Sequence, residues 1–297
     1  MTKNDLSGEG DSLSLNGEKE IKLSLRRYER CKEGDLVILF GGYETISQVI
    51  LTSNGKFQTK SGLYLHNDII GKTYGTRIMN AVGTKWMAVL KPTPELISIS
   101  LNHRTQILYQ ADISLICVLL DLSPGKNVIE AGTGSGSLTA SLSRSVLPGG
   151  NVFTFEYDKK RYLEAINDFK RYKLENIYCH HQDVCKDGFA SPHIDLDSTL
   201  INAIFLDLPS PWLVVKHINS ILTRGSKIVI FSPCIEQVSK NNFELINLKC
   251  SQIRTFEILY KPWGLVRGSL KDSSSDALRY QLPMRGHTGY ITFAIKD

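Results

Sequence analysis

The sequence lacks the features that mark membrane, secreted and disulfide-rich proteins. It contains no run of 18 apolar residues, the length that a membrane-spanning helix needs. Its first twenty residues are polar and lack the basic-then-apolar order of a signal peptide. The six cysteines form no C-x-x-C pair, which is more typical of reduced thiols than of a disulfide framework. We therefore expect a soluble intracellular protein with no disulfides and no membrane partner.

A strong excess of one charge is also missing. The net charge of the 297 residues is +5, but the first twenty hold five acidic residues against Lys3 and Lys19, so the rest of the chain has a charge of +8. A mildly basic body is compatible with a phosphate-bearing partner, although many soluble enzymes are equally basic.

The chain divides into three regions by composition. Residues 1–20 are rich in Ser, Gly, Asn and charged residues, and they have too few apolar groups to offset the entropy of ordering. We interpret them as a disordered polar tail. Between residues 21 and 90, short β-like runs alternate with turns such as Asn54-Gly55, which predicts a small all-β, barrel-like domain. The two prolines of LKPTPELISISL discourage helix at their own positions and suggest a junction.

Residues 91–297 have the texture of an α/β domain. Apolar runs (NVIEAG, NVFTFEYD, NIYCHHQD, NAIFLDLP and KIVIFSP) alternate with amphipathic stretches of ten or more residues. That alternation predicts a parallel sheet flanked by helices. Near the end, FEILYK and YITFAIKD follow one another as strands without a helix between them, so we expect an antiparallel terminal pair.

A glycine-rich loop is the strongest motif. It runs from Glu130 to Gly136 (EAGTGSG) between a strand and a helix, where glycines let the backbone turn and approach a ligand. Glu156 follows 20 residues after Gly136, at the end of the next strand, where a carboxylate can accept hydrogen bonds from both hydroxyls of a ribose. This spacing indicates an adenosine-type ligand but does not separate a dinucleotide from S-adenosylmethionine. Glu130 favours the latter, because it suits a cationic amino acid and would repel a pyrophosphate. A tight turn without a ligand is the alternative.

Two further acids end predicted strands. Asp183, in HHQDVC, is placed to accept a hydrogen bond from the cofactor's adenine amino group, and the alternative role is a helix cap. Asp207, in FLDLPSPW, precedes two prolines and Trp212, which predicts a rigid site for a planar substrate. Its alternative role is also a structural cap.

The cysteine and histidine residues near Asp183 do not predict a metal site. Cys179, His180, His181 and Cys185 lie close together in the sequence, but alternate residues of a strand face opposite sides of a sheet. We therefore expect no metal.

The order and spacing of TQILYQADI, EAGTGSGS, FEYDKKR, QDVC, FLDLPSPW, FSPCIEQV and HTGYITFA resemble the eukaryotic tRNA adenine-N1 methyltransferase catalytic subunit family. The resemblance extends over all but the polar tail. The sequence departs from animal members by extra residues around Ser191 to Leu200 and in the segment from Gly264 to Arg285. It implies a class I S-adenosylmethionine-dependent methyltransferase with a Rossmann-like sheet and a small N-terminal all-β domain. It also implies that the enzyme methylates N1 of the T-loop adenine, position 58, of tRNA.

The motifs and the resemblance together predict the site residues. Asp207 is the expected catalytic carboxylate. The expected cofactor contacts are Leu108, Glu130, Gly132, Gly134, Ser135, Gly136, Ser137, Glu156, Arg161, Asp183, Val184 and Asp207. The expected substrate contacts are Gln106, Ile107, Tyr109, Gln110, Leu208, Pro209, Ser232, Pro233, Cys234, Gln237 and Thr288.

Family resemblance further implies tRNA as a partner, nuclear localisation, and a heterotetramer with a non-catalytic paralogous subunit that lacks the cofactor motif. Three alternatives stay open at this point. They are a class I methyltransferase with a protein or small-molecule substrate, a non-catalytic RNA-binding subunit, and a nicotinamide-dependent oxidoreductase. The intact set of Glu156, Asp183 and Asp207 argues against the second, and Glu130 and FLDLPSPW argue against the third.

Overall fold

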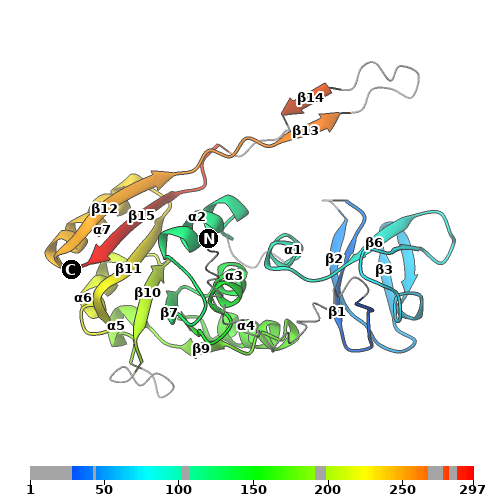
Figure 1. Ribbon diagram of the computed structural model, residues 1–297, viewed down its shortest axis with the longest axis horizontal. Helices are drawn as coiled ribbons and strands as arrows, with labels where there is room; N and C mark the ends of the chain where they lie inside the picture. The colour runs from blue at the N-terminus through cyan, green and yellow to red at the C-terminus, as the bar shows by residue number, and fades with distance from the viewer. Residues whose placement is uncertain (1–28, 43–44, 102–106, 191–198, 267–276, 281–285) are drawn as a thin grey trace, which may run out of the picture.

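A computed structural model describes residues 29–42, 45–101, 107–190, 199–266, 277–280 and 286–297. A small antiparallel β domain lies beside a larger α/β domain, and the two are joined by a short helix (Figure 1). The polar tail predicted at residues 1–20 lies outside the described residues.

The small domain has an antiparallel sheet and a separate hairpin. The sheet has the order β2-β1-β6-β5, formed by β2 (Ile46–Ile50), β1 (Leu36–Phe40), β6 (Trp86–Leu90) and β5 (Arg77–Met79). The hairpin pairs β3 (Lys56–Thr59) with β4 (Gly62–Leu65), and η1 (His66–Asp68) follows it. The core of the small domain includes Val37, Leu39, Tyr64 and Met87, which are fully buried. The short β-like runs expected between residues 21 and 90 form strands of this domain. β5 was not predicted from the sequence, since a strand of three residues is too short to show a pattern.

The expected break at the two prolines is instead a helix. Thr93 caps α1 (Pro94–Ser100) by accepting a hydrogen bond from the amide of Leu96, and Pro94 occupies the first helical turn. A proline at that position loses no intrahelical hydrogen bond and already has the helical φ angle. The segment that the sequence suggested as a junction thus contains a helix, and Pro94 starts that helix instead of opposing it.

The large domain is built on a seven-stranded sheet with the order β12-β15-β11-β10-β7-β8-β9. Five strands are parallel: β7 (Val128–Ala131), β8 (Val152–Glu156), β9 (Ile177–His181), β10 (Ile201–Leu206) and β11 (Leu222–Ser232). The chain order reverses between β7 and β10, so the carboxyl ends of these two strands flank the crevice where open α/β sheets bind ligands.

Helices cover both faces of this sheet. On one face α2 (Gln110–Leu119) and α3 (Ser137–Val146) pack on a core that includes Val128, Phe205 and Val229. On the other, α6 (Trp212–Ile218) and α7 (Ile235–Asn247) pack on a core that includes Ile129 and Ile204. The remaining helices are α4 (Lys159–Arg171), which contacts β8 and β9, and α5 (Val184–Asp187), which contacts α6.

The predicted antiparallel terminal pair is confirmed only in part, because Phe256 and Glu257 of the FEILYK run pair with the last strand while residues 258–261 are in no strand. β15 (Tyr290–Lys296) runs antiparallel between β11 and β12 (Cys250–Glu257), so its insertion distinguishes the sheet from an all-parallel dinucleotide-binding sheet. β12 begins six residues before the predicted run, and its register with β15 shifts between Ser251 and Arg254. Between β12 and β15 the chain forms a hairpin of β13 (Trp263–Val266) and β14 (Ala277–Tyr280), which projects from the body as an arm (Figure 1).

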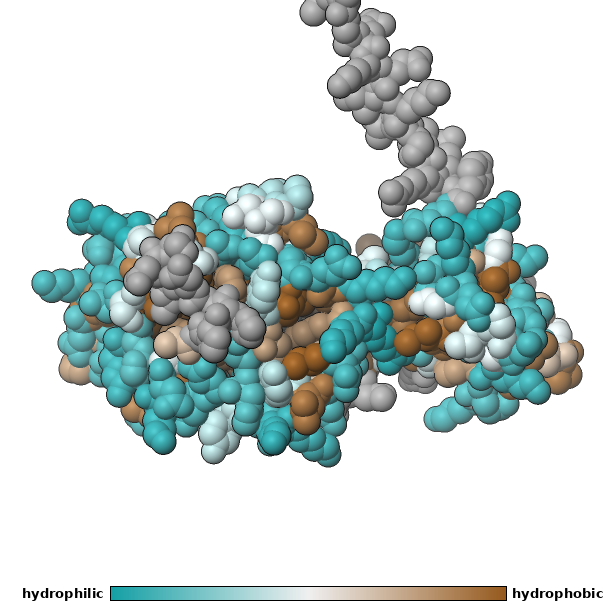
Figure 2. All heavy atoms as spheres, turned by 90° about the horizontal axis from the view of Figure 1, so that it is seen from below, coloured by the Kyte–Doolittle hydropathy of each residue, from teal (hydrophilic) through white to brown (hydrophobic). Residues whose placement is uncertain are grey.

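None of the described helices is long and apolar enough to cross a membrane. The face seen in Figure 2 is mostly hydrophilic on both domains, and apolar atoms show near the middle of the large domain.

Phe155 of β8 provides a test of the core. It is 1% exposed and packs against His180 and, edge-on, against Phe189. We expect Phe155→Ala to lower the free energy of unfolding by about 3–5 kcal/mol, through lost burial and the cavity left behind. Phe243→Ala is the matched control, since Phe243 is 63% exposed and should change stability by less than about 0.5 kcal/mol. Equal shifts in chemical denaturation would contradict this packing.

Candidate active site

The glycine loop and the end of β10 are in close backbone contact. The amide of Gly132 donates to the carbonyl of Phe155 at 2.9 Å, and the amide of Asp207 donates to the carbonyl of Ala131 at 2.9 Å. Gly132 has a φ of +98°, and a Cβ atom built there would lie 2.1 Å from the carbonyl oxygen of Asp207. Only glycine fits at this position, so the loop is tied to the residue that the sequence predicted to be catalytic.

Gly136 has a structural role in the same loop. It precedes α3 with a left-handed φ of +76°, and an added Cβ would lie 2.8 Å from the ring of Phe169 in α4. The residue therefore permits the entry into α3 and the packing of α4 against it. It does not line the cavities described below, although it was predicted to contact the cofactor.

Glu156 ends β8 as predicted, but most of its hydrogen-bonding capacity is already in use. Its Oε1 atom accepts bonds from the amide of Asp158 at 2.9 Å and from the guanidinium of Arg161 at 2.7 and 3.1 Å. Its Oε2 atom accepts the amide of Gly134 at 3.0 Å. The second lone pair of Oε2 leaves room for one ribose hydroxyl, so bonds to both hydroxyls require Arg161 to move.

Glu130 is 1% exposed in β7 and lines the cavity formed by the glycine loop. Its Oε2 atom accepts hydrogen bonds of 2.6 Å from the hydroxyls of Thr139 and Thr154, while Oε1 accepts none from the described residues. Burial raises the pKa of Glu130 to about 8, against the lowering effect of the two hydroxyls. A bound ammonium group would offset this cost of desolvation, as the sequence argument expected.

A larger cavity of about 470 Å³ extends from the glycine loop past the end of β8. Its walls include Glu156, Arg161, Asp183 and Val184, all predicted cofactor contacts. Asp183 also caps α5, because its Oδ1 atom accepts the amide of Cys185 at 3.1 Å. The cap that the sequence left as an alternative therefore coexists with a place in the cavity wall. Gln182, Cys185 and Leu213 also line it and were not predicted.

Asp207 lies where three cavities meet. It lines the cavity beside Glu130, the one beside Glu156, and a third of about 300 Å³. Burial raises the pKa of Asp207 to about 6, so the carboxylate form still predominates at neutral pH. A carboxylate at this junction can face both a cofactor and a second molecule.

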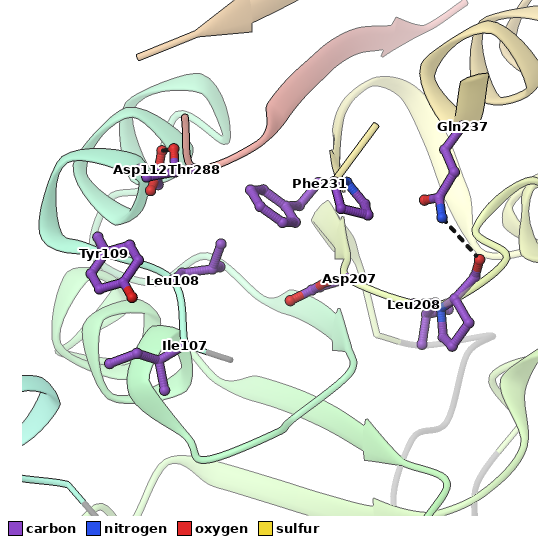
Figure 3. A pocket seen from close by; sticks show the side chains of 11 residues that line it. Ile107, Leu108, Tyr109, Asp112, Asp207, Leu208, Phe231, Gln237 and Thr288 are labelled. Carbon is purple, nitrogen blue, oxygen red and sulfur yellow. Dashed lines mark hydrogen bonds between the residues drawn. The ribbon is translucent and has the colours of Figure 1, made fainter. Parts of the chain in front are cut away.

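The third cavity has the composition expected of a site for a flat, mainly apolar molecule. Leu108, Tyr109 and Phe231 form walls around the carboxylate of Asp207 (Figure 3). Tyr109 was a predicted substrate contact and Leu108 a predicted cofactor contact. Six further predicted substrate contacts also line the cavity, namely Ile107, Leu208, Pro209, Pro233, Gln237 and Thr288.

Of the predicted substrate contacts that the structure describes, Gln110, Ser232 and Cys234 do not line this cavity. Gln106 lies outside the described residues. Gln110 lines a neighbouring apolar cavity instead. Ser232 is fully buried and accepts a hydrogen bond of 3.0 Å from Asn241, and Cys234 occupies the position before α7 without a side-chain capping hydrogen bond. A strand ending at a site alternates its side chains between two faces, which is why Ser232 points into the core while Phe231 reaches the cavity.

Asp112 is a site residue that the sequence analysis missed. It is 1% exposed in the first turn of α2, lines the third cavity, and its Oδ1 atom accepts the hydroxyl of Thr288 at 2.9 Å. Its Oδ2 atom is buried without a partner. An acid within the TQILYQADI motif was the available signal, but its burial depends on contact with Thr288, 176 residues away.

No group of three or more His, Cys, Asp or Glu side chains within the described ranges has an arrangement that could hold a metal ion.

Solved structures with the same fold show the class of protein. A SAM-dependent O-methyltransferase from Thermotoga maritima aligns with a TM-score of 0.76 and 28% identity, over 90% of this chain and 94% of its own. The tRNA (m1A58) methyltransferase of Aquifex aeolicus aligns with a TM-score of 0.69 and 27% identity, over 90% of this chain and 99% of its own. With the sheet order, the glycine loop and Glu156, they define a class I S-adenosylmethionine-dependent methyltransferase.

Sequence comparison identifies the family within that class. Residues 85–281 match the model of the tRNA methyltransferase complex GCD14 subunit. A Dictyostelium discoideum protein named tRNA (adenine(58)-N(1))-methyltransferase catalytic subunit is 37% identical, over 89% of this chain and 96% of its own length. The chain belongs to this family of tRNA methyltransferase complex subunits.

Glu130 should make cofactor binding depend on pH. If the ammonium group of S-adenosylmethionine binds beside a carboxylate whose pKa is about 8 in the free protein, binding releases a proton at neutral pH. The affinity should then rise several-fold from pH 6.5 to about 8 and fall at higher pH, where the cofactor's own amino group, with an ordinary pKa of about 8, loses its proton. Titration calorimetry in buffers of different ionisation enthalpy would measure both effects. Glu130→Gln is the control and should flatten the pH dependence, whereas an equally steep dependence in this variant would contradict the assignment.

Proposed function

We propose that the chain is the catalytic subunit of a tRNA (adenine(58)-N1)-methyltransferase, which transfers a methyl group from S-adenosylmethionine to N1 of the T-loop adenine. The observation that supports this most directly is the position of Asp207 between the two cofactor cavities and the apolar cavity. The names of the Dictyostelium and Aquifex relatives support the choice of substrate.

The cofactor, when bound, supplies an electrophilic methyl group. N1 of adenine has a free lone pair, so no group on the protein needs to remove a proton before attack. The carboxylate of Asp207 accepts a hydrogen bond from the 6-amino group, which orients N1 toward the methyl donor. As positive charge develops on the ring, the same carboxylate stabilises it more strongly than it stabilises the neutral base, which lowers the barrier.

Leu108, Tyr109 and Phe231 provide the apolar surfaces that hold the base and exclude water. N1 lies on the Watson-Crick edge and is covered in a folded T loop, so the base must be extruded to reach this cavity. Extrusion disturbs the tRNA elbow and therefore needs a large basic surface that binds the tRNA backbone. The net charge of +8 on the body of this chain is small for such a surface.

We further propose that a non-catalytic paralogous subunit supplies this additional surface, in a heterotetramer of two catalytic and two non-catalytic chains. The description of the family as subunits of a complex supports a multi-subunit enzyme. The β13–β14 arm supports it too, because an isolated two-stranded hairpin is marginally stable in water. Four large side chains of the arm are half or more exposed, and a partner would cover them: Trp263, Leu265, Leu278 and Tyr280.

We also propose nuclear localisation, which the family resemblance implies. A fluorescent fusion of the chain expressed in its own cell type would test it, and exclusion from the nucleus would contradict it.

Asp207→Ala tests the mechanism. Loss of the carboxylate should lower the rate of methyl transfer by at least about 100-fold, while cofactor affinity changes by only a few-fold.

In the unchanged protein the rate should fall about tenfold for each pH unit below pH 6, because protonation of Asp207 removes the acceptor. Methyl transfer by Asp207→Ala at the rate of the unchanged protein would contradict the catalytic role of Asp207.

Methyl transfer to unmodified tRNA tests the proposed function itself. The chain would be assayed alone and with the paralogous subunit, followed by nucleoside analysis of the product. We expect 1-methyladenosine at position 58 and full activity only with the partner. Methylation of protein or of small hydroxyl compounds, without methylation of tRNA, would instead favour an O-methyltransferase like the Thermotoga relative.

A further inference from the structure

The ring of Phe231 packs against a residue that has no side chain. β11 and β15 run antiparallel and pair Phe231 with Ile291. Gly289 lies two residues before Ile291, so it is on the same face of the sheet and is the diagonal neighbour of Phe231. A Cβ atom built on Gly289 would lie 2.3 Å from Cζ and 2.5 Å from Cε2 of that ring. The ring therefore keeps its place only while residue 289 is a glycine.

The segment around Gly289 is tied to two other elements. The hydroxyl of Thr288 donates a hydrogen bond of 2.9 Å to Oδ1 of Asp112 in α2. Nδ1 of His287 is hydrogen-bonded to Oε1 of Glu257 in β12 at 2.5 Å. Both bonds hold the backbone next to Gly289. A collision between a side chain at this position and the ring would therefore be relieved by rotation of the ring, because a side chain rotates more easily than a backbone held at two points.

Rotation would take the ring into the third cavity. Phe231 is 9% exposed and packs in the core with Ile113 of α2 and with Ile291. Its remaining side borders the cavity of about 300 Å³ that Leu108 and Asp207 also line (Figure 3). Core side chains are close-packed and leave little room for a displaced group, so the ring would fill part of the cavity.

We propose that Gly289 is a positioning residue for the methyl acceptor: by leaving room for the ring of Phe231, it keeps open the cavity in which the target base lies against that ring. This inference rests on the proposed function and adds to it a residue that does not itself line the cavity. With a side chain at residue 289 the ring would occupy part of the space of the base, so the base would bind more weakly and farther from the methyl donor. Neither Gly289 nor Phe231 lines the two cofactor cavities, so cofactor binding should not change.

Gly289→Ala tests this role, assayed in the full chain with the paralogous subunit present. We expect kcat/KM on unmodified tRNA to fall by about tenfold or more, because a misplacement of about 1 Å can cost about 100-fold in rate. The affinity for S-adenosylmethionine should stay unchanged. Gly286→Ala is the matched control, since a Cβ atom there would meet nothing within 4 Å, and it should leave kcat/KM unchanged.

A second background separates the collision from backbone strain. Gly289 has a φ of +154°, so alanine there is also strained. Phe231→Leu removes the ring atoms that the Cβ atom would meet and keeps an apolar wall, and we expect it to lower kcat/KM by about fivefold through lost stacking. In the Phe231→Leu background, Gly289→Ala should lower kcat/KM by less than about threefold further, because the collision is gone while the strain remains.

Thermal unfolding of each variant would show that it is folded. The inference is overturned if Gly289→Ala keeps the kcat/KM of the unchanged enzyme, or if it costs as much in the Phe231→Leu background as in the unchanged one. Either result would leave the proposed function standing. If the unchanged enzyme with its partner does not methylate tRNA at all, the proposed function fails and the inference fails with it.

Discussion

A side chain of any size at residue 132 would occupy the position of the Asp207 carbonyl oxygen. This steric limit brings the turn after β7 into contact with the turn after β10, which neighbours it in the sheet. The first turn forms the walls of the cofactor cavities, and the second positions Asp207, Leu208 and Pro209. Because the two turns touch through backbone atoms, the two cofactor cavities and the third, apolar cavity all open onto the carboxylate of Asp207. The reaction geometry thus follows from a packing constraint in the sheet.

The same close packing brings Glu130 and Asp207 together, with Glu156 nearby. Burial and the neighbouring carboxylates both raise the pKa of Glu130, so the site without a ligand has an excess of negative potential. Such a site suits a cofactor with a sulfonium and an ammonium group, and a product that is itself a cation. Arg161 balances part of this charge through its ion pair with Glu156. The negative charge of the site and the arrangement of its cavities therefore both favour methyl transfer from a cationic cofactor.

The sequence alone predicted the parallel sheet, the glycine loop and the three strand-end acids, because these depend on local spacing. It did not predict that Gly136 serves packing against Phe169, or that Ser232 points into the core, since both depend on which face a residue presents. Asp112 was missed because its burial requires Thr288, which is distant in sequence. α1 was missed because the two prolines were expected to discourage helix at their own positions, whereas Pro94 lies in the first turn. Tertiary contacts decide each of these cases.

Cofactor binding by Gly132→Ala tests the central constraint most directly. The matched control is Gly286→Ala, since a Cβ atom at residue 286 would meet nothing within 4 Å. Titration calorimetry with S-adenosylmethionine would be combined with thermal unfolding to confirm that both variants fold. We predict that Gly132→Ala folds but loses affinity by at least about tenfold, because the loop must move away from Asp207, while Gly286→Ala binds normally. Unchanged affinity in Gly132→Ala would contradict the account.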